Sequence, residues 1–358
     1  MLNKIQRMKK LLLILLCSGW TYYATSQNLP RVIVLSTGGT IAGQQPNSDK
    51  AGYLPGKISI EELLKNIPSI TQKAIVQGEQ IASIGSYDMT VDIWIKLARR
   101  INEIFAKNEA DGIVITHGTD TQEETAYFLN LTVQSDKPVV LTGSMRPATA
   151  ISADGSKNLF DAIIVASEPG SIGKGVLLCF NENIYDAKNV VKTSMTNVNA
   201  FSSPNTGALG QVYDSKVFYN TQTLNRHSGS AAFDISKLDS LLNVEIVYAY
   251  AGASNAAINA FIDNNVAGII IAGTGNGSFD KAILESVKKA VKKGILVVRS
   301  SRVVSGRVPT QYVGVFDDSK LGTIVSDNLN PQKARILLML ALTITKDKNK
   351  IQEMFFTY

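Results

Sequence analysis

The strongest constraint on the fold is a series of short apolar runs that end near glycine and alternate with amphipathic segments. Apolar runs of this kind are typical of strands buried on both faces of a parallel sheet. In the first half of the chain they lie at 31–37, 112–116, 138–142 and 175–180, and helical spacing occurs at 90–107, 121–133 and 153–167. The alternation predicts an α/β protein with right-handed crossovers and with loops gathered at the carboxyl ends of the strands.

The pattern changes in the middle of the chain. From 206 to about 226 it resembles a hairpin, a polar stretch at 225–230 follows, and the alternation then resumes. We expect strands at 244–250, 268–272 and 295–300, and helices at 281–293 and 330–346. A boundary near 225–240 predicts a larger N-terminal domain, residues 27–230, with a mixed, mostly parallel sheet, and a smaller parallel α/β domain, residues 240–358. Ser59 and Glu62 form a capping box that predicts a short helix at 60–66.

The first residues have the composition of an export signal. Four basic residues precede the apolar run 11–17, which is too short to span a bilayer, and small residues at 24–26 predict cleavage before Gln27. Residues 1–26 are therefore interpreted as a signal peptide, and the mature protein is expected to be periplasmic or secreted, without a membrane anchor. Cys17 raises the alternative of lipidation, although the bulky Leu16 before it disfavours that processing.

Charge and cysteine content exclude several classes of protein. The net charge of +6 falls to about +2 without residues 1–26, so the electrostatic case for nucleic-acid binding is weak. Cys179 is then the one remaining cysteine, within a predicted buried strand, and no intrachain disulfide is expected. With two dispersed histidines the chain offers no cluster of metal ligands, and we expect neither a metal nor a cofactor.

Two glycine-containing motifs follow predicted strands. In the first, 36–43 (STGGTIAG), the glycines allow a sharp turn that brings backbone N–H groups near a ligand and presents the hydroxyl of Thr40. Taken alone, this motif is more often a plain strand-to-loop turn. In the second, 115–121 (ITHGTDT), Asp120 or Thr121 can serve simply as a helix cap. A general-base role for His117 is weighed against a structural one, and we leave it out of the catalytic set.

Other motifs are less informative. A third loop, 143–147 (GSMRP), also follows a strand, whereas 273–277 (GTGNG) lacks the spacing and the acidic partner of a dinucleotide-binding loop. The segment 173–175 (GKG) lacks the Ser or Thr of a phosphate loop, and no G-x-S-x-G elbow is present. Hydroxyl chemistry on glycine-rich loops remains.

The paired motifs resemble the two signatures of bacterial type II, periplasmic L-asparaginases. The likeness covers nearly the whole chain after residue 26. It is carried by 37–43 (TGGTIAG), 116–121 (THGTDT), 123–129 (EETAYFL), 136–140 (DKPVV), 145–147 (MRP), 152–155 (SADG), 298–303 (VRSSRV) and 330–335 (NPQKAR). The resemblance implies hydrolysis of L-asparagine to L-aspartate and ammonia, a flavodoxin-like C-terminal domain, and a homotetramer whose sites lie between neighbouring chains.

The same resemblance implies roles for single residues. Thr40 corresponds to the nucleophile on a loop that closes over the substrate, and Tyr53 to the tyrosine that hydrogen-bonds it. Thr119, Asp120 and Lys192 correspond to a second catalytic triad, and Ser86 to the serine that binds the substrate α-carboxylate, while Asp120 also takes the α-ammonium. Gly39, Tyr87 and Ser144 complete the expected substrate-binding set.

The chemistry agrees with these roles. A preorganised oxyanion site contributes most to attack on an amide, and a threonine hydroxyl needs a base to become a nucleophile. Lys192 can be that base only when neutral; without the resemblance it reads as an exposed lysine, and Tyr53 as a loop aromatic. Both an acyl-threonine intermediate and direct attack by water remain open.

Three positions depart from the family pattern. Tyr87 stands where many relatives carry Gln, and Gly252 stands where some carry Asn. The segment 310–318 (TQYVGVFDD) lacks the glutamate that relatives extend into a neighbour's site. These departures concern the amino end of the substrate or the contribution of the neighbouring chain. They leave the affinity and the preference for asparagine over glutamine open, and they keep a glutaminase-asparaginase as the alternative. An amidotransferase subunit and an exported amino-acid-binding protein are further alternatives, opposed by the leader and by the duplicated hydroxyl motifs respectively.

Overall fold

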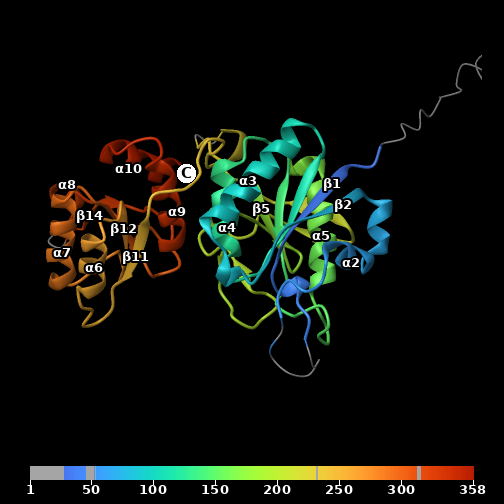
Figure 1. Ribbon diagram of the computed structural model, residues 1–358, viewed down its shortest axis with the longest axis horizontal. Coiled ribbons are helices and arrows are strands. Elements are labelled where there is room, and N and C mark those ends of the chain that lie inside the picture. The colour runs from blue at the N-terminus through green and yellow to red at the C-terminus, as the bar shows by residue number, and fades with distance from the viewer. Residues whose placement is uncertain (1–27, 46–51, 53, 231–232, 313–315) are drawn as a thin grey trace, which may run out of the picture.

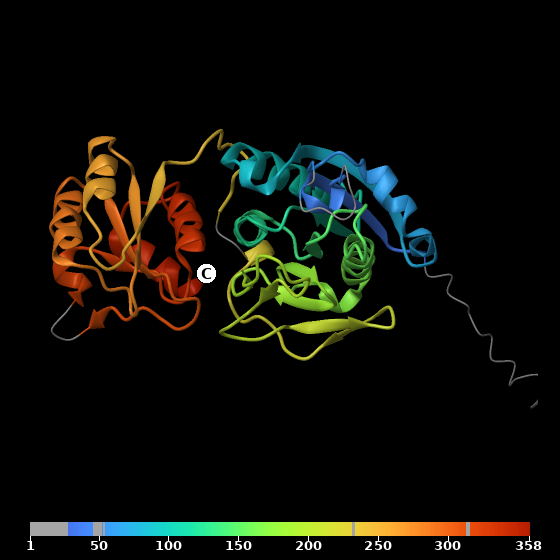
Figure 2. The ribbon, with the colours of Figure 1, turned by 90° about the horizontal axis from the view of Figure 1, so that it is seen from below.

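The computed structural model describes residues 28–45, 52, 54–230, 233–312 and 316–358, which form two α/β domains side by side (Figure 1). The chain passes from the larger to the smaller domain between Tyr219, where the last strand of the larger sheet ends, and Val244, where the first strand of the smaller sheet begins (Figure 2). The strands of the larger sheet are β1 (Arg31–Gly38), β2 (Ile75–Ile84), β3 (Gly112–Thr116), β4 (Val139–Thr142), β5 (Val176–Phe180), β6 (Asn183–Asp186), β9 (Gly210–Tyr213) and β10 (Lys216–Tyr219). Its helices are α2 (Ile60–Lys65), α3 (Val91–Ala106), α4 (Gln122–Thr132) and α5 (Gly155–Ser167), and a separate pair of short strands is β7 (Val191–Lys192) and β8 (Phe201–Ser202).

The smaller domain is built on a four-stranded parallel sheet. Its strands are β11 (Val244–Tyr248), β12 (Gly268–Gly273), β13 (Leu296–Ser301) and β16 (Ile324–Val325). The other elements are α6 (Ala256–Asp263), α7 (Lys281–Lys292), β14 (Gln311–Tyr312), β15 (Phe316–Asp317), α8 (Asp318–Leu321), α9 (Pro331–Ala341) and α10 (Lys348–Thr357). The expected larger domain with a mixed sheet and smaller domain with a parallel sheet are confirmed.

The strand order of the larger sheet identifies where a site can form. The sheet runs β10-β9-β6-β5-β4-β3-β1-β2, with β1 to β5 parallel and the remaining three strands antiparallel. The parallel part thus has the 2-1-3-4-5 order of flavodoxin, which reverses between β1 and β3. The smaller sheet keeps chain order, β11-β12-β13-β16, with no reversal. Ligands of open α/β sheets bind where the order reverses, so the carboxyl ends of β1 and β3 are the expected location.

Alternate side chains of the strands enter two separate layers. On β1, Ile33 and Leu35 join the core under α3 and α4, whereas Val32 and Val34 join the core under α2 and α5. Each strand is buried on both faces, which is why the parallel strands read as continuous apolar runs. The capping box is present as well, because the Ser59 hydroxyl accepts from the backbone N–H of Glu62.

Helix α4 is shared by the two domains. It packs on the sheet of the larger domain and against α9 of the smaller domain (Figure 1), and one hydrophobic core continues across it into α9 and α10. Its buried residues therefore include polar ones such as Gln122, Glu123 and Asn130. No helix in the described part of the chain is long and apolar enough to cross a membrane.

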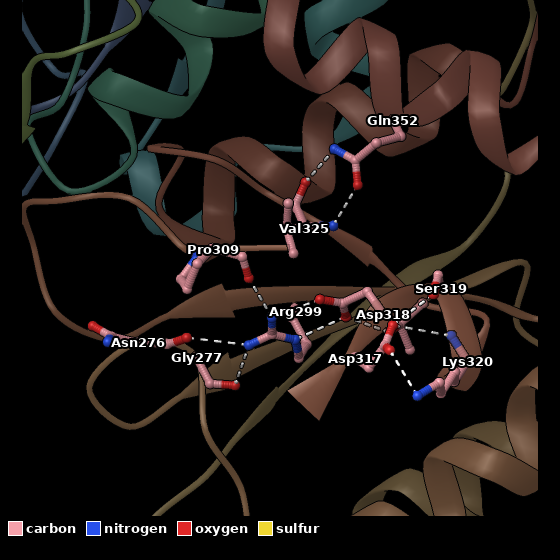
Figure 3. Close-up of polar contacts among 11 residues, drawn as sticks. Asn276, Gly277, Arg299, Pro309, Asp317, Asp318, Ser319, Lys320, Val325 and Gln352 are labelled. Atoms are coloured by element: carbon pink, nitrogen blue, oxygen red, sulfur yellow. Dashed lines mark hydrogen bonds and ion pairs between the residues drawn. The ribbon is translucent and has the colours of Figure 1, made fainter. Parts of the chain in front are cut away.

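A buried ion pair organises the loops of the smaller domain. Arg299, on β13, donates from Nε and Nη2 to the two carboxylate oxygens of Asp318 at 2.8 and 2.6 Å, and also to the carbonyls of Asn276, Gly277 and Pro309 (Figure 3). The Arg299 side chain is fully buried. The Arg299 guanidinium thus connects α8 to two loops at the end of the sheet. One of these loops contains residues 273–277, and its carbonyls are held in a tight turn by this arginine.

A chain of buried hydrogen bonds fixes the end of β3. The His117 ring accepts at Nε2 from the Thr125 hydroxyl at 2.9 Å, and that hydroxyl accepts from the Trp94 indole at 2.8 Å. Nδ1 lies 2.7 Å from the Gly118 carbonyl, which requires the proton on Nδ1. His117 is fully buried, and burial lowers its pKa to about 4. It is a neutral residue that orients the turn after β3.

This environment predicts a pH-dependent contribution to stability. In the unfolded chain His117 takes up a proton near pH 6.5, whereas in the folded protein it does so near pH 4. The stability advantage of the wild type over a His117→Gln variant should be greatest above pH 6.5. It should narrow by up to about 3 kcal/mol as the pH falls to 4. Urea unfolding of both proteins across this range measures the difference, and an advantage independent of pH would contradict the assignment.

Candidate active site

Two turns meet through their glycines at the expected edge of the sheet. Gly39, after β1, has φ 78°, and a Cβ atom there would lie 2.3 Å from the backbone nitrogen of Gly118. A Cβ atom on Gly118, after β3, would lie 2.6 Å from the hydroxyl of Ser86. Neither glycine can be replaced without moving backbone or a buried side chain. The residues that follow them, Thr40 and Thr119, are each 5% exposed.

The first turn is held by main-chain hydrogen bonds. Thr40 begins a short 3-10 helix, Thr40–Ala42, in which Gly43 donates to the Thr40 carbonyl at 2.8 Å. The chain then returns through a bridge between Gln44 and Leu54. Tyr53, expected to hydrogen-bond Thr40, lies outside the described residues. The backbone N–H of Gly39 is committed to the Ile84 carbonyl at 2.8 Å, so it is not a free donor to a ligand.

The structure brings together Thr119, Asp120 and Lys192. The Lys192 ammonium donates to the Thr119 hydroxyl at 2.9 Å and to the Asp120 carboxylate at 2.6 Å. The Lys192 side chain is 17% exposed, whereas that of Asp120 is 56% exposed. Lys192 is therefore not the exposed lysine of the alternative interpretation. The carboxylate beside it remains accessible to a ligand.

Ser86 belongs to the same cluster. It follows β2 in the 3-10 helix Ser86–Asp88, and it is 4% exposed. Its hydroxyl accepts from the Asp120 backbone N–H at 3.2 Å, and its carbonyl accepts from the Thr121 hydroxyl at 2.7 Å. The neighbouring Tyr87 is 68% exposed and its ring lies over Gly85. Tyr87 thus lies at the surface next to the buried cluster.

Ser144 is placed differently from the other expected ligand-binding residues. It is fully buried behind the first turn, near Ile41, and its hydroxyl donates to the Arg146 carbonyl at 2.7 Å. That hydroxyl is engaged within the protein, so Ser144 supports the loop after β4 in this state.

Glu123 and Asn330, two polar residues to which the sequence assigned no role, lie behind the Thr119–Asp120–Lys192 cluster. Glu123 accepts from the Lys192 backbone N–H at 2.5 Å and from the Asn330 side-chain amide at 2.9 Å. Burial, together with the charge of Glu123, raises the pKa of Glu124 to about 7. The EETAYFL segment contains both carboxylates, but it gives no indication that one contacts a residue of the smaller domain.

A cavity of about 280 Å³ opens beside this cluster. Its lining includes Asp120, Glu123 and Lys192 from the larger domain, and Tyr248 and Arg302 from the smaller one. Among the described residues, no group of three or more His, Cys, Asp or Glu side chains is placed to hold a metal ion. The groups available for chemistry are hydroxyls, an ammonium and a carboxylate, a set suited to acid–base and nucleophilic catalysis.

Comparison with known proteins agrees with this geometry. The families described as "Asparaginase, N-terminal" and "Glutaminase/Asparaginase C-terminal domain" match residues 31–225 and 243–355. A Haemophilus influenzae protein named "Probable L-asparaginase periplasmic" is 48% identical over 93% of this chain and 94% of its own. A "Glutaminase-asparaginase" from Pseudomonas fluorescens is 42% identical over 93% and 92%.

A solved structure extends the comparison to three dimensions. It is titled as a probable cytoplasmic L-asparaginase from Campylobacter jejuni, and it is 49% identical to this chain. The two superpose with a TM-score of 0.88 over 92% of this chain and 100% of the other. With both family domains matched in order and relatives aligned over nearly their whole length, the chain belongs to the asparaginase family.

Proposed function

We propose that this protein hydrolyses the side-chain amide of L-asparagine, releasing L-aspartate and ammonia. The contact of Lys192 with Thr119 and Asp120, directly beside the meeting point of Gly39 and Gly118, is the observation that carries the proposal. It places a hydroxyl, an ammonium and an accessible carboxylate next to the turn that bears Thr40. The family membership supports the same reaction.

In the proposed mechanism Thr40 is the nucleophile and Tyr53 its hydrogen-bonding partner. The Thr40 hydroxyl passes its proton to a base as its oxygen attacks the carboxamide carbon. The C–N bond then breaks, and the departing nitrogen takes up that proton and leaves as ammonia. Water then hydrolyses the resulting ester and releases aspartate. A hydroxyl needs a base for this attack, and a fixed set of donors lowers the energy of the oxyanion. The N–H of Gly39 is bonded to Ile84, so the oxyanion donors must be other groups of the two turns.

The second triad acts on the other side of the same amide. Asp120 binds the substrate α-ammonium, and Ser86 binds the α-carboxylate. A substrate ammonium competes with Lys192 for the Asp120 carboxylate, which frees Lys192 to give up a proton and to accept the one from Thr119. Direct attack by water activated in this way is the alternative to an ester on Thr40.

We also propose that the protein is exported and assembles as a homotetramer. Export is supported by the leader-like composition of residues 1–26, which lie outside the described residues, and by the periplasmic name of one relative. The tetramer is supported by the family resemblance. It follows that the substrate site lies between neighbouring chains, although segment 310–318 lacks the glutamate that relatives extend into a neighbour's site.

Loss of the lysine should separate the two mechanisms. Lys192→Met should lower kcat about 10²- to 10⁴-fold, because it removes proton transfer at Thr119. If Thr40 forms an ester, mass spectrometry of this variant with asparagine should show the acyl adduct on the peptide that contains Thr40. Lys288→Met is the matched control: Lys288 forms an exposed ion pair with Glu285 on α7, and the kcat of this variant should stay at the wild-type value. Repeated absence of the adduct would favour direct attack by water.

The preference between the two amides tests the closest alternative, a glutaminase-asparaginase. Ammonia release by residues 27–358 should be faster from asparagine, with kcat/KM exceeding that for glutamine by about 10- to 200-fold, because a pocket separates one methylene by about 1–3 kcal/mol. Thr40→Ala is the control for contaminating activity and should release no ammonia. Comparable kcat/KM values for the two substrates would replace the proposal with a dual-substrate glutaminase-asparaginase, the name of the Pseudomonas fluorescens relative.

A further inference from the structure

We infer that Glu123 is a positioning residue for the catalytic Lys192, and that the smaller domain sets the position of this lysine through Asn330 and Lys333 of α9. The inference rests on the proposed function, since it concerns the same lysine. It adds that the position of the Lys192 side chain depends on how the two domains of one chain pack together.

The carboxylate of Glu123 connects three elements. It lies in the first turn of α4 and is 6% exposed. Oε2 accepts from the backbone N–H of Lys192 on β7 at 2.5 Å, and Oε1 accepts from Nδ2 of Asn330 at 2.9 Å. Asn330 is also the N-cap of α9, where its Oδ1 accepts from the Lys333 N–H at 3.0 Å. Every polar atom of the Asn330 side chain therefore has a defined partner.

Lys333 holds the chain just before Lys192. Lys333 is 1% exposed, and its ammonium donates to the carbonyl of Lys188 at 2.9 Å and to that of Val190. Burial lowers the pKa of Lys333, while the nearby carboxylates of Glu123, Asp186 and Glu124 oppose that shift. The segment that ends in Lys192 is thus held in two ways. Lys333 of α9 binds two of its carbonyls, and Glu123, itself bound to Asn330, binds the N–H of Lys192.

These contacts matter because β7 has little support of its own. It has two residues and pairs with the equally short β8 in a sheet of two strands. The Lys192 side chain must nevertheless keep 2.9 Å to Thr119 and 2.6 Å to Asp120. A displacement of about 1 Å at a catalytic group can cost about 100-fold in rate. Glu123 binds the main chain of Lys192 rather than its ammonium, so it acts through position.

The donor and acceptor pattern allows a compensating pair of substitutions. In Glu123→Gln the amide oxygen can still accept from Lys192, but the new NH₂ group then faces Nδ2 of Asn330, donor against donor. In Asn330→Asp two carboxylates face each other. Each single variant should lower kcat for asparagine about 10- to 100-fold and change KM less than about threefold. Glu123→Gln with Asn330→Asp restores a donor facing an acceptor and keeps the cap on Lys333, so kcat should return to within about threefold of wild type.

Two further variants separate position from stability. Gln352→Leu removes two hydrogen bonds to Val325, at 2.8 and 3.1 Å, within the smaller domain (Figure 3). The contacts of Glu123, Asn330 and Lys333 do not involve Gln352, so this variant should lower the melting temperature and leave kcat unchanged. Asn330→Ser keeps a cap acceptor but removes the donor to Glu123. It should lower kcat about three- to tenfold, with a fall in melting temperature no larger than that of Gln352→Leu, which provides a test if Glu123→Gln fails to fold.

The outcomes distinguish this inference from the proposed function. Recovery of kcat in the double variant, with single losses larger than that of Gln352→Leu, supports positioning by Glu123. Wild-type kcat in the single variants, or a double variant no faster than the slower single one, overturns the inference while wild-type asparagine hydrolysis stands. No ammonia release from asparagine by the wild type would instead overturn the proposed function.

Discussion

The site depends on one close contact between backbones, that of Gly39 with Gly118. A side chain on either residue would collide with the other turn or with Ser86, so the approach is possible only between glycines. The contact lies where the order of the parallel strands reverses, between β1 and β3, and both turns leave the sheet at its carboxyl edge. The residue after each glycine is a threonine. The sheet topology brings the turns together, and the absence of side chains lets them touch.

The second requirement is a lysine that no parallel strand of the sheet supplies. Lys192 comes from a strand of two residues outside the sheet, and its ammonium reaches a buried hydroxyl and a carboxylate that solvent can reach. This difference in exposure has a chemical consequence. A ligand can approach Asp120 while Lys192 stays shielded, and the proposed mechanism uses this difference when it couples binding of the substrate ammonium to proton transfer at Thr119.

Much of this fold follows from the sequence because the parallel strands are buried on both faces. The apolar runs at β1, β3, β4 and β5 were predicted to within one or two residues. Strand β2 was not, because it is the edge strand and the polar residues Gln77, Glu79 and Gln80 interrupt its apolar ones. At the site, the motifs indicated the two turns, but not that the Ser144 hydroxyl is engaged by Arg146, since a loop sequence does not specify where a hydroxyl points. The roles of the site residues themselves stay predictions.

The contact between Glu123 and Asn330 could not be predicted from the sequence, for a more general reason. In the sequence Asn330 precedes Pro331 and reads as the N-cap of a helix, a role it fulfils with one atom of its side chain. Its other atom reaches the larger domain, and only the packing of α9 on α4 reveals this. Helix α4 is buried between the two domains, and the carboxylate of Glu123 in its first turn takes one partner from β7 and one from the N-cap of α9. The Glu123 carboxylate thus links Asn330 of the smaller domain to the backbone nitrogen of Lys192 in the larger one, and the inferred positioning of this lysine rests on that connection.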